Sequence, residues 1–246
     1  MLGFKASGRV SAAAAAGNTM HRVVGSALLT VGAGCLASCA LAAEPAAWPA
    51  SVKASYEITF AGVDVGWFRF ESRVGPREYS LEGRAKVSAL FGAFKWHGDT
   101  KSNGLVRSDG PDPLAYSLDY KSNSKRGGVR MGLRGGAVTQ LELLPNRRRS
   151  RRAVPLTRDH LSGVLDPLSA IMALSRTTSG DPCAKTLSIF DGKQRFEIRL
   201  SYASGARRGR GGTSRDVKAG VVCKVQYVPI AGHKPNRSID FMARTD

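Results

Sequence analysis

The sequence predicts a mainly β protein, an antiparallel meander with one α-helix, and three observations carry this prediction. First, apolar and polar residues alternate along many short segments, which is the pattern of a strand with one buried face. Second, short turn signals separate these segments, so consecutive strands are expected to pair antiparallel. Third, residues 166–175 carry helix signals in place of alternation.

The alternating segments begin soon after residue 50. In the first of them, Val52, Tyr56 and Phe60 share one phase, while charged and hydroxyl residues fill the other. Asp191-Gly192 gives the strongest hairpin signal, because this pair suits a two-residue turn between twisted strands. The predicted strands are residues 52–60, 65–74, 79–88, 94–102, 114–121, 129–133, 187–190, 195–202 and 221–227.

The helix prediction depends on its first two residues. Asp166 is a favoured N-cap, and Pro167 would occupy the first helical position, where its missing N–H costs nothing. Leu168, Ile171 and Met172 then form one apolar face. We therefore expect a single helix at about residues 166–175.

Residues 1–43 at the N-terminus are predicted to be an export signal. A small-residue, apolar stretch follows Arg22, and Ala42-Ala43 supplies a cleavage site. Met20 is a plausible start, which would make residues 1–19 an extension. A membrane anchor is the disfavoured alternative, because the stretch is weakly hydrophobic and rich in Gly and Ala. Residues 44–246 are then a single β-rich envelope domain, and the predicted location is the periplasm.

A second interpretation concerns how the chain is released. Residues 36–39, Leu-Ala-Ser-Cys, match a bacterial lipoprotein box, in which Cys39 would be lipidated. The residues that follow still resemble signal sequence, so ordinary cleavage near Ala43 is favoured. A lipid-anchored lipoprotein at the envelope remains the alternative.

The chain is strongly basic, with a net charge of +18. Removal of the leader's Lys5, Arg9 and Arg22 leaves +15. Such a charge favours anionic partners, including an anionic membrane surface. The densest run consists of Arg147, Arg148, Arg149, Arg151 and Arg152, which are predicted contacts to an anionic ligand because arginine pairs well with phosphate. A solvated loop is the alternative. No nucleic acid is expected, because the run interleaves no aromatic residues.

Two cysteines remain after the leader, Cys183 and Cys223. An even pair in an exported domain predicts a disulfide. Two separate buried thiols are the alternative. A zinc site is disfavoured, because no His stands at ligand spacing from either cysteine.

No motif predicts an enzyme. Asp159, His160 and Ser162 are the residue types of an acyl-transfer triad, but sequence neighbours are not thereby arranged as one, and no G-x-S-x-G elbow is present. His97 and His233 stand singly. We therefore predict no catalytic, cofactor-binding or metal-binding residue, and no cofactor. The aromatic residues of the first half are expected in the core, or around a cavity that holds an acyl chain.

Several motifs, taken in order, resemble one known family. They are Tyr56, Phe60, Gly62 and Gly66, then Trp96 and Gly104, then residues 166–170, then Cys183, Asp191-Gly192 and Cys223. Over about residues 52–241 they resemble the bacterial envelope family called domain of unknown function 3108. The resemblance implies a curved antiparallel sheet, half-barrel or β-spiral-like, with one helix, and no established catalytic residues. It also leaves a C-terminal truncation open, because members continue with further strand sequence after the position of Phe241.

These observations together predict an exported, non-enzymatic cell-envelope protein. Its expected ligand is a lipid, lipoprotein or glycan, held in the concave face of the sheet. The alternative is a structural or scaffolding protein that binds another envelope protein. An uncharacterised hydrolase is the weaker alternative.

Overall fold

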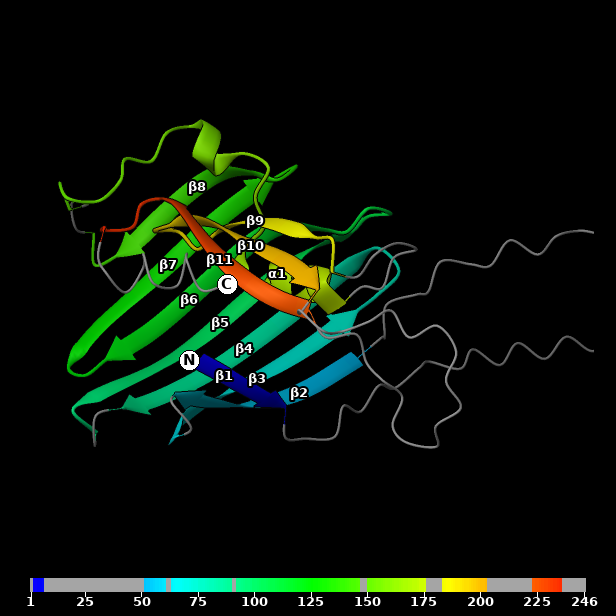
Figure 1. The fold of residues 1–246 in the computed structure, drawn as a ribbon. Coiled ribbons are helices and arrows are strands. Elements are labelled where there is room, and N and C mark those ends of the chain that lie inside the picture. Colours follow the sequence, from blue (N-terminus) through cyan, green and yellow to red (C-terminus); the bar gives the residue numbers. More distant parts are fainter. Residues whose placement is uncertain are drawn as a thin grey trace, which may run out of the picture.

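The structure is a computed structural model that describes residues 2–6, 51–60, 63–89, 92–146, 150–175, 183–202 and 223–235. Its largest element is an eight-stranded sheet in which every strand pairs antiparallel with the next (Figure 1). The strands are β1 Leu2–Ala6, β2 Ser51–Phe60, β3 Val63–Val74, β4 Glu78–Ala89, β5 Phe94–Val106, β6 Pro111–Ser122, β7 Lys125–Arg134 and β8 Ala137–Leu144. The meander expected from the alternating pattern is therefore present.

A second, smaller sheet follows the large one in sequence. It contains β9 Thr186–Phe190, β10 Arg195–Tyr202 and β11 Cys223–Ala231, in the order β11-β10-β9. Between the two sheets in sequence come a 3-10 helix, Asp159–Leu161, and the one α-helix of the described residues, α1, Pro167–Ser175. The helix prediction is confirmed, and Asp166 caps it by accepting the N–H groups of Leu168 and Ser169 at 2.9 and 3.1 Å.

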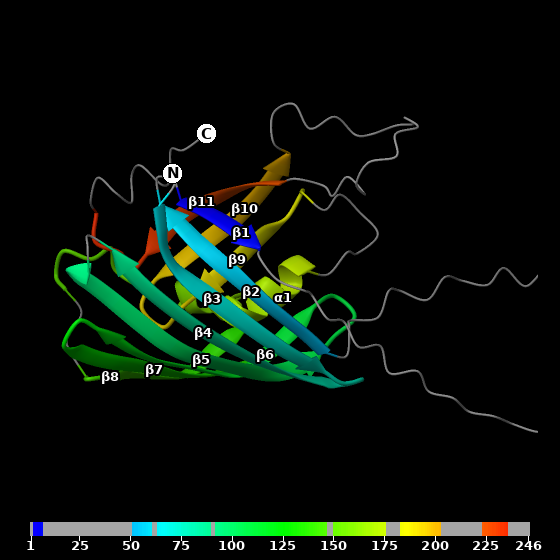
Figure 2. The ribbon, with the colours of Figure 1, turned by 90° about the horizontal axis from the view of Figure 1, so that it is seen from below.

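The large sheet is curved, and α1 and the small sheet lie on its concave side (Figure 2). Two hydrophobic clusters fill the space between these layers. In the first, Leu168 and Met172 of α1 pack against Phe70, Tyr79 and Leu81 of the sheet. In the second, Phe190 of β9 and Val164 pack against Tyr116, Val129, Met131 and Leu133. The centre of the concave face is therefore occupied by the protein's own side chains.

The predicted fold class is confirmed: the described part of the chain is mostly antiparallel β with one α-helix, and its large sheet is open and curved. The sequence pattern did not separate β9–β11 into a sheet of their own. Alternation of apolar and polar residues indicates that one face of a strand is buried. It does not indicate which layer of the protein covers that face.

The N-terminal predictions fall largely outside the described residues. The proposed leader includes β1, which pairs with β2 from Leu2 opposite Phe60 to Ala6 opposite Tyr56. Residues 7–50, with the cleavage site and Cys39, lie outside the described part, as do residues 236–246 at the other terminus. Within the described residues, no helix has the length and apolar character needed to span a bilayer.

Candidate functional site

A pocket of about 460 Å³ opens at one end of the concave side. The ends of β6 and β8 and the start of β7 form one wall. The β9–β10 hairpin and the segment after β11 form the other wall. The lining residues are Tyr120, Ser122, Lys125, Arg126, Leu143, Leu144, Pro145, Ser150, Ala153, Lys193, Gly232 and Lys234. The pocket thus lies where the two sheets approach each other at their edges.

The β9–β10 hairpin brings Lys193 to the pocket. The Asp191 Oδ1 atom accepts the backbone N–H groups of Lys193 and Gln194 at 2.7 and 2.6 Å, which fixes the turn. Burial raises the pKa of Asp191, and these two N–H groups and the charge of Lys193 oppose that rise. Gly192 has a φ of +93°, and a Cβ there would come within 2.3 Å of Val129 Cγ1. Only glycine lets the turn approach β7 so closely.

Lys193 then reaches across to the large sheet. Its Nζ donates a hydrogen bond to the Tyr120 hydroxyl at 2.7 Å and lies 4.5 Å from the centroid of the Tyr120 ring. The ring also stacks against Trp96, with centroids 6.4 Å apart and an interplanar angle of 19°. Gly127 stands opposite Tyr120 in the β6–β7 pairing, and a Cβ there would meet the Tyr120 ring at 2.4 Å. The missing side chain lets the ring extend over β7.

The charge of the pocket is one-sided. Four of its lining residues are basic and none is acidic: Lys125, Arg126, Lys193 and Lys234. Within the described part of the chain, Lys125, Arg126 and Lys234 form no ion pair, so their charges are not neutralised by the protein. Leu143, Leu144, Pro145 and Ala153 supply an apolar wall beside them. This combination suits a ligand that has an anionic group joined to an apolar group.

Backbone hydrogen bonds hold the outer wall of the pocket in place. The Gly232 N–H donates to the Val154 carbonyl at 2.8 Å, and the Val154 N–H donates to the His233 carbonyl at 2.9 Å. This pair joins the segment after β8 to the segment after β11. Ala153, next to Val154, and Lys234, next to His233, therefore line the same cavity.

A buried polar network under α1 is a separate feature. Ser102 donates to Asp166 Oδ2 at 2.8 Å, Ser169 donates to the same oxygen, and the Tyr79 hydroxyl lies 2.7 Å from the Ser169 hydroxyl. All four side chains are buried, and Asp166 and Ser169 are completely so. Burial raises the pKa of Asp166, and its hydrogen bonds with Ser169, Ser102 and Leu168 oppose the rise. The network ties the start of α1 to β4 and β5, and none of its members lines the 460 Å³ pocket.

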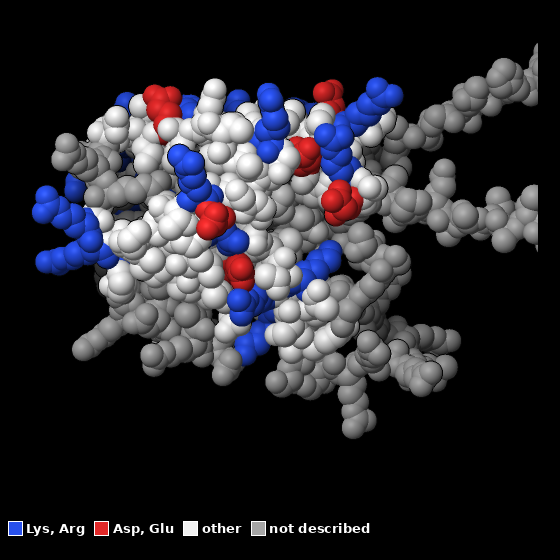
Figure 3. Space-filling model, turned by 90° about the horizontal axis from the view of Figure 1, so that it is seen from above, with Lys and Arg blue, Asp and Glu red and all other residues white. Residues whose placement is uncertain are grey.

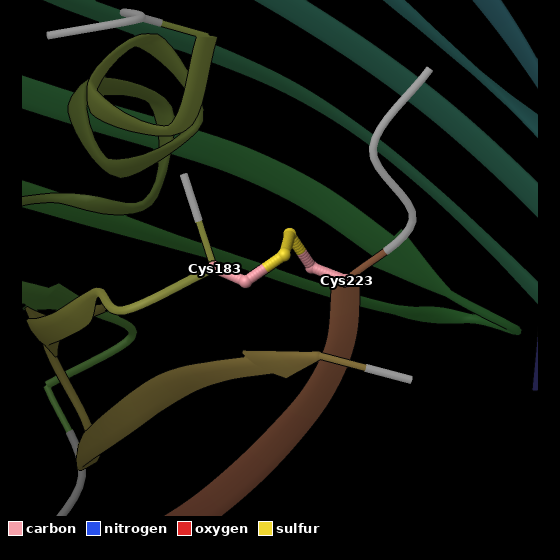
Figure 4. Close-up of a disulfide and its surroundings, with 2 residues drawn as sticks. All are labelled: Cys183 and Cys223. Carbon is pink, nitrogen blue, oxygen red and sulfur yellow. A yellow bond between two sulfur atoms is a disulfide. The ribbon is translucent and has the colours of Figure 1, made fainter. Parts of the chain in front are cut away.

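The predicted arginine run borders this pocket only in part. Arg151 and Arg152 lie exposed in a turn directly after Ser150, which lines the pocket. Arg147, Arg148 and Arg149 lie outside the described residues. The pairing of Cys183 with Cys223 is confirmed: the structure joins them in a disulfide with Cα atoms 5.4 Å apart, which links the segment before β9 to the start of β11 (Figure 4).

The three residues of the hypothetical triad are not brought together. His160 Nδ1 accepts the Thr157 N–H at 3.1 Å and faces the Thr157 hydroxyl at 3.2 Å. No side-chain hydrogen bond joins Asp159, His160 and Ser162 in the described structure.

The two single histidines differ in environment. His97 is exposed on β5, and His233 has a buried Nδ1 without a partner among the described residues. The described residues also hold no group of three or more His, Cys, Asp or Glu side chains placed to bind a metal.

The basic residues of the pocket were missed by the sequence reasoning. Lys125 and Arg126 begin a strand, Lys193 follows a turn, and Lys234 follows the last strand. Each is an ordinary surface lysine or arginine when considered alone. Only the approach of the two sheets gathers them, so no local signal in the sequence could have identified them.

Comparison with known proteins supports one assignment. A family model described as "Protein of unknown function (DUF3108)" matches residues 55–242. No curated protein and no solved structure matches the chain. The family match extends over most of the sequence and over all of the elements from β3 to β11 that build the pocket. The chain therefore belongs to the family of proteins of unknown function DUF3108.

Proposed function

We propose that this protein is an exported, non-enzymatic component of the cell envelope that binds an anionic, lipid-like molecule in the pocket between its two sheets. One observation carries the proposal. The pocket sets four basic residues and no acidic one beside an apolar wall of Leu143, Leu144 and Pro145. The anionic head of the ligand would meet the basic residues, and its apolar part would meet the wall.

The size and polarity of the pocket support this ligand class. Small-molecule sites commonly enclose about 300–1,000 Å³, and the pocket at about 460 Å³ falls within that range. The hydroxyl groups of Ser122 and Ser150 add neutral hydrogen-bond donors for a phosphate or carboxylate head. Side chains of α1 and the small sheet fill the centre of the concave face, and the pocket lies beside this filled region.

Two features support an envelope location. The Cys183–Cys223 disulfide suits an oxidising compartment, where such bonds persist. The small-residue, apolar stretch before Ala43 suits export. Fractionation of cells that express the full chain, followed by alkylation of free thiols, tests both. We expect the protein outside the cytoplasm with Cys183 and Cys223 protected from the reagent, whereas cytoplasmic protein with two labelled thiols would contradict the proposal.

Native mass spectrometry of the protein purified from that fraction tests the ligand. We expect an anionic lipid to co-purify with the wild type and to be lost from the double variant Lys125→Glu/Lys234→Glu. The matched control is Lys53→Glu/Lys101→Glu, which makes the same charge change at exposed lysines outside the pocket. Empty wild-type protein, equal lipid loss in both doubles, or a co-purified neutral glycan would each contradict the proposal.

A further inference from the structure

A row of basic side chains crosses the outer face of the large sheet at one end. There β4 and β6 finish and β5 and β7 begin, on the left in Figure 1. Strand pairing places Lys86 opposite His97, His97 opposite Lys121, and Lys121 opposite Arg126. Directly paired residues share a face, and adjacent strands lie about 4.8 Å apart, so the row extends roughly 15 Å. It contains no acidic residue.

The next row along the same face is different. Two residues further along, Arg84 stands opposite Asp99, and Asp99 stands opposite Asp119. Arg84 Nε lies 3.5 Å from Asp99 Oδ1, and Arg130 Nη2 lies 2.8 Å from Asp119 Oδ1. Both aspartates of this row therefore have a basic partner, Arg84 within the row and Arg130 from the next register position. The basic character of the end row is a local feature and not a general property of the outer face.

Repulsion between the charges of the end row is expected to lower the stability of the fold. Like charges directly opposite each other in an antiparallel pair are destabilising, and Lys121 and Arg126 are such a pair. Among the described residues, neither these two side chains nor Lys86 forms an ion pair. Stability alone would favour an acidic residue at one of these positions. Within the described part of the chain, the row therefore has no anionic partner.

The strand ends next to this row add two lysines and an exposed aromatic ring. Lys95 is the second residue of β5 and Lys125 is the first residue of β7, and both are exposed. Phe94, directly before Lys95, is 39% exposed and belongs to neither hydrophobic cluster. A groove of about 410 Å³ lies along the row, and Lys86, Lys95 and Lys121 are among its lining residues. In Figure 3, which views the molecule from above Figure 1, Lys and Arg side chains project at the left end of the molecule.

We propose that this strand-end surface, defined as Lys86, Phe94, Lys95, Lys121, Lys125 and Arg126, docks the protein on an anionic phospholipid bilayer. The five basic residues complement lipid phosphates, and each lysine or arginine near such a surface strengthens binding about fivefold. The exposed Phe94 ring suits the boundary between headgroups and acyl chains. Lys125 and Arg126 also line the 460 Å³ pocket, whereas Lys86, Phe94, Lys95 and Lys121 do not, so variants at these four positions test the surface separately from the ligand proposal.

Co-sedimentation of the purified, disulfide-bonded protein with vesicles tests the proposal. The vesicles contain phosphatidylglycerol in phosphatidylcholine, and vesicles of phosphatidylcholine alone serve as the reference. We expect wild-type protein to bind only the anionic vesicles and to be released by salt. The double variant Lys86→Gln/Lys121→Gln should bind about 25-fold more weakly, from two losses of about fivefold each. The Phe94→Ser variant should also bind more weakly, with unchanged salt sensitivity.

The matched control is Lys53→Gln/Lys101→Gln, which removes the same charge from exposed positions outside the strand-end surface. We expect this control to bind like the wild type. Equal weakening of both doubles would overturn the proposal in favour of a general charge effect. Absence of vesicle binding by the wild type would overturn it too, and so would equally tight binding to a soluble polyanion such as heparin.

Folding is checked with the Lys121→Gln variant, which relieves the repulsion with Arg126. Its midpoint of urea unfolding should equal or exceed that of the wild type, while its vesicle binding falls. A lower midpoint would contradict the repulsion on which the proposal rests. Lys86 and Lys121 do not line the 460 Å³ pocket, so normal lipid co-purification with weakened vesicle binding in Lys86→Gln/Lys121→Gln separates the two proposals.

Discussion

Lys193 Nζ donates a hydrogen bond to the Tyr120 hydroxyl at 2.7 Å, and this bond joins the hairpin of the small sheet to β6 of the large sheet. The two residues are 73 positions apart in sequence. Both residues line the pocket, one from each wall, so their contact joins the two walls. The stability of the pocket therefore depends on the docking of the two sheets.

Replacement of Tyr120 by Phe tests this bond. The substitution removes the acceptor of a charged donor and keeps the ring that stacks on Trp96, so we expect the free energy of unfolding to fall by about 1.5 kcal/mol. Urea denaturation measures the change. Tyr56→Phe is the control, because the Tyr56 hydroxyl makes no hydrogen bond within the described residues. Equal effects in the two variants would contradict the role of Lys193.

The turn at Gly192 should tolerate no side chain. Gly192→Ala combines a positive φ with the close approach to Val129, so we expect a loss of about 3 kcal/mol in the free energy of unfolding. Gly135→Ala is the matched control: Gly135 has a φ of +56° but open space around it, and its loss should be only about 1 kcal/mol. Thermal unfolding of the two variants separates the steric effect from the backbone effect. Similar losses would show that the contact with Val129 is unimportant.

The disulfide should contribute strongly to stability. Cys183 and Cys223 are 40 residues apart, and a loop of that size implies about 4 kcal/mol of stabilisation through the unfolded state. We expect Cys183→Ser/Cys223→Ser to unfold at a correspondingly lower urea concentration. Addition of dithiothreitol should destabilise the wild type and leave the double variant unchanged. A wild type that is insensitive to the reductant would refute the prediction.

The buried Asp166 should make stability depend on pH. Burial raises its pKa, so the folded protein binds the Asp166 proton more tightly than the unfolded chain does. This stabilisation is complete below the unfolded pKa of about 4 and is lost as pH rises through the folded pKa. The wild type should therefore lose stability relative to Asp166→Asn as pH increases from about 4. Parallel unfolding profiles of the two proteins over this range would count against the assignment.

Local sequence was sufficient for most of the secondary structure. The alternation from Val52 to Phe60 reappears as β2, and the Asp166-Pro167 start reappears as the capped beginning of α1. Asp191-Gly192 forms the predicted turn between β9 and β10. Each of these features depends on residues within a few positions of one another, so the sequence contains the whole cause.

Neither the pocket nor the strand-end surface could be predicted in the same way. Lys193 is a pocket residue because Gly192 fits against Val129 from a different sheet. Lys86, Lys121 and Arg126 form a row only because the register of three hairpins aligns them. A shift of one residue in any of these registers would move its lysine or arginine to the other face.

The sequence by itself determined the β-rich meander, the single helix, the disulfide partners and the strongly basic charge, because these depend on local pattern or composition. The tertiary structure decided where the charge gathers and where a cavity remains. Those properties arise from the curvature of the large sheet and from the layer that α1 and the small sheet pack onto its concave side. Long-range packing and strand register place Tyr120 beside Lys193 and Lys121 beside Arg126, and no local pattern encodes either contact.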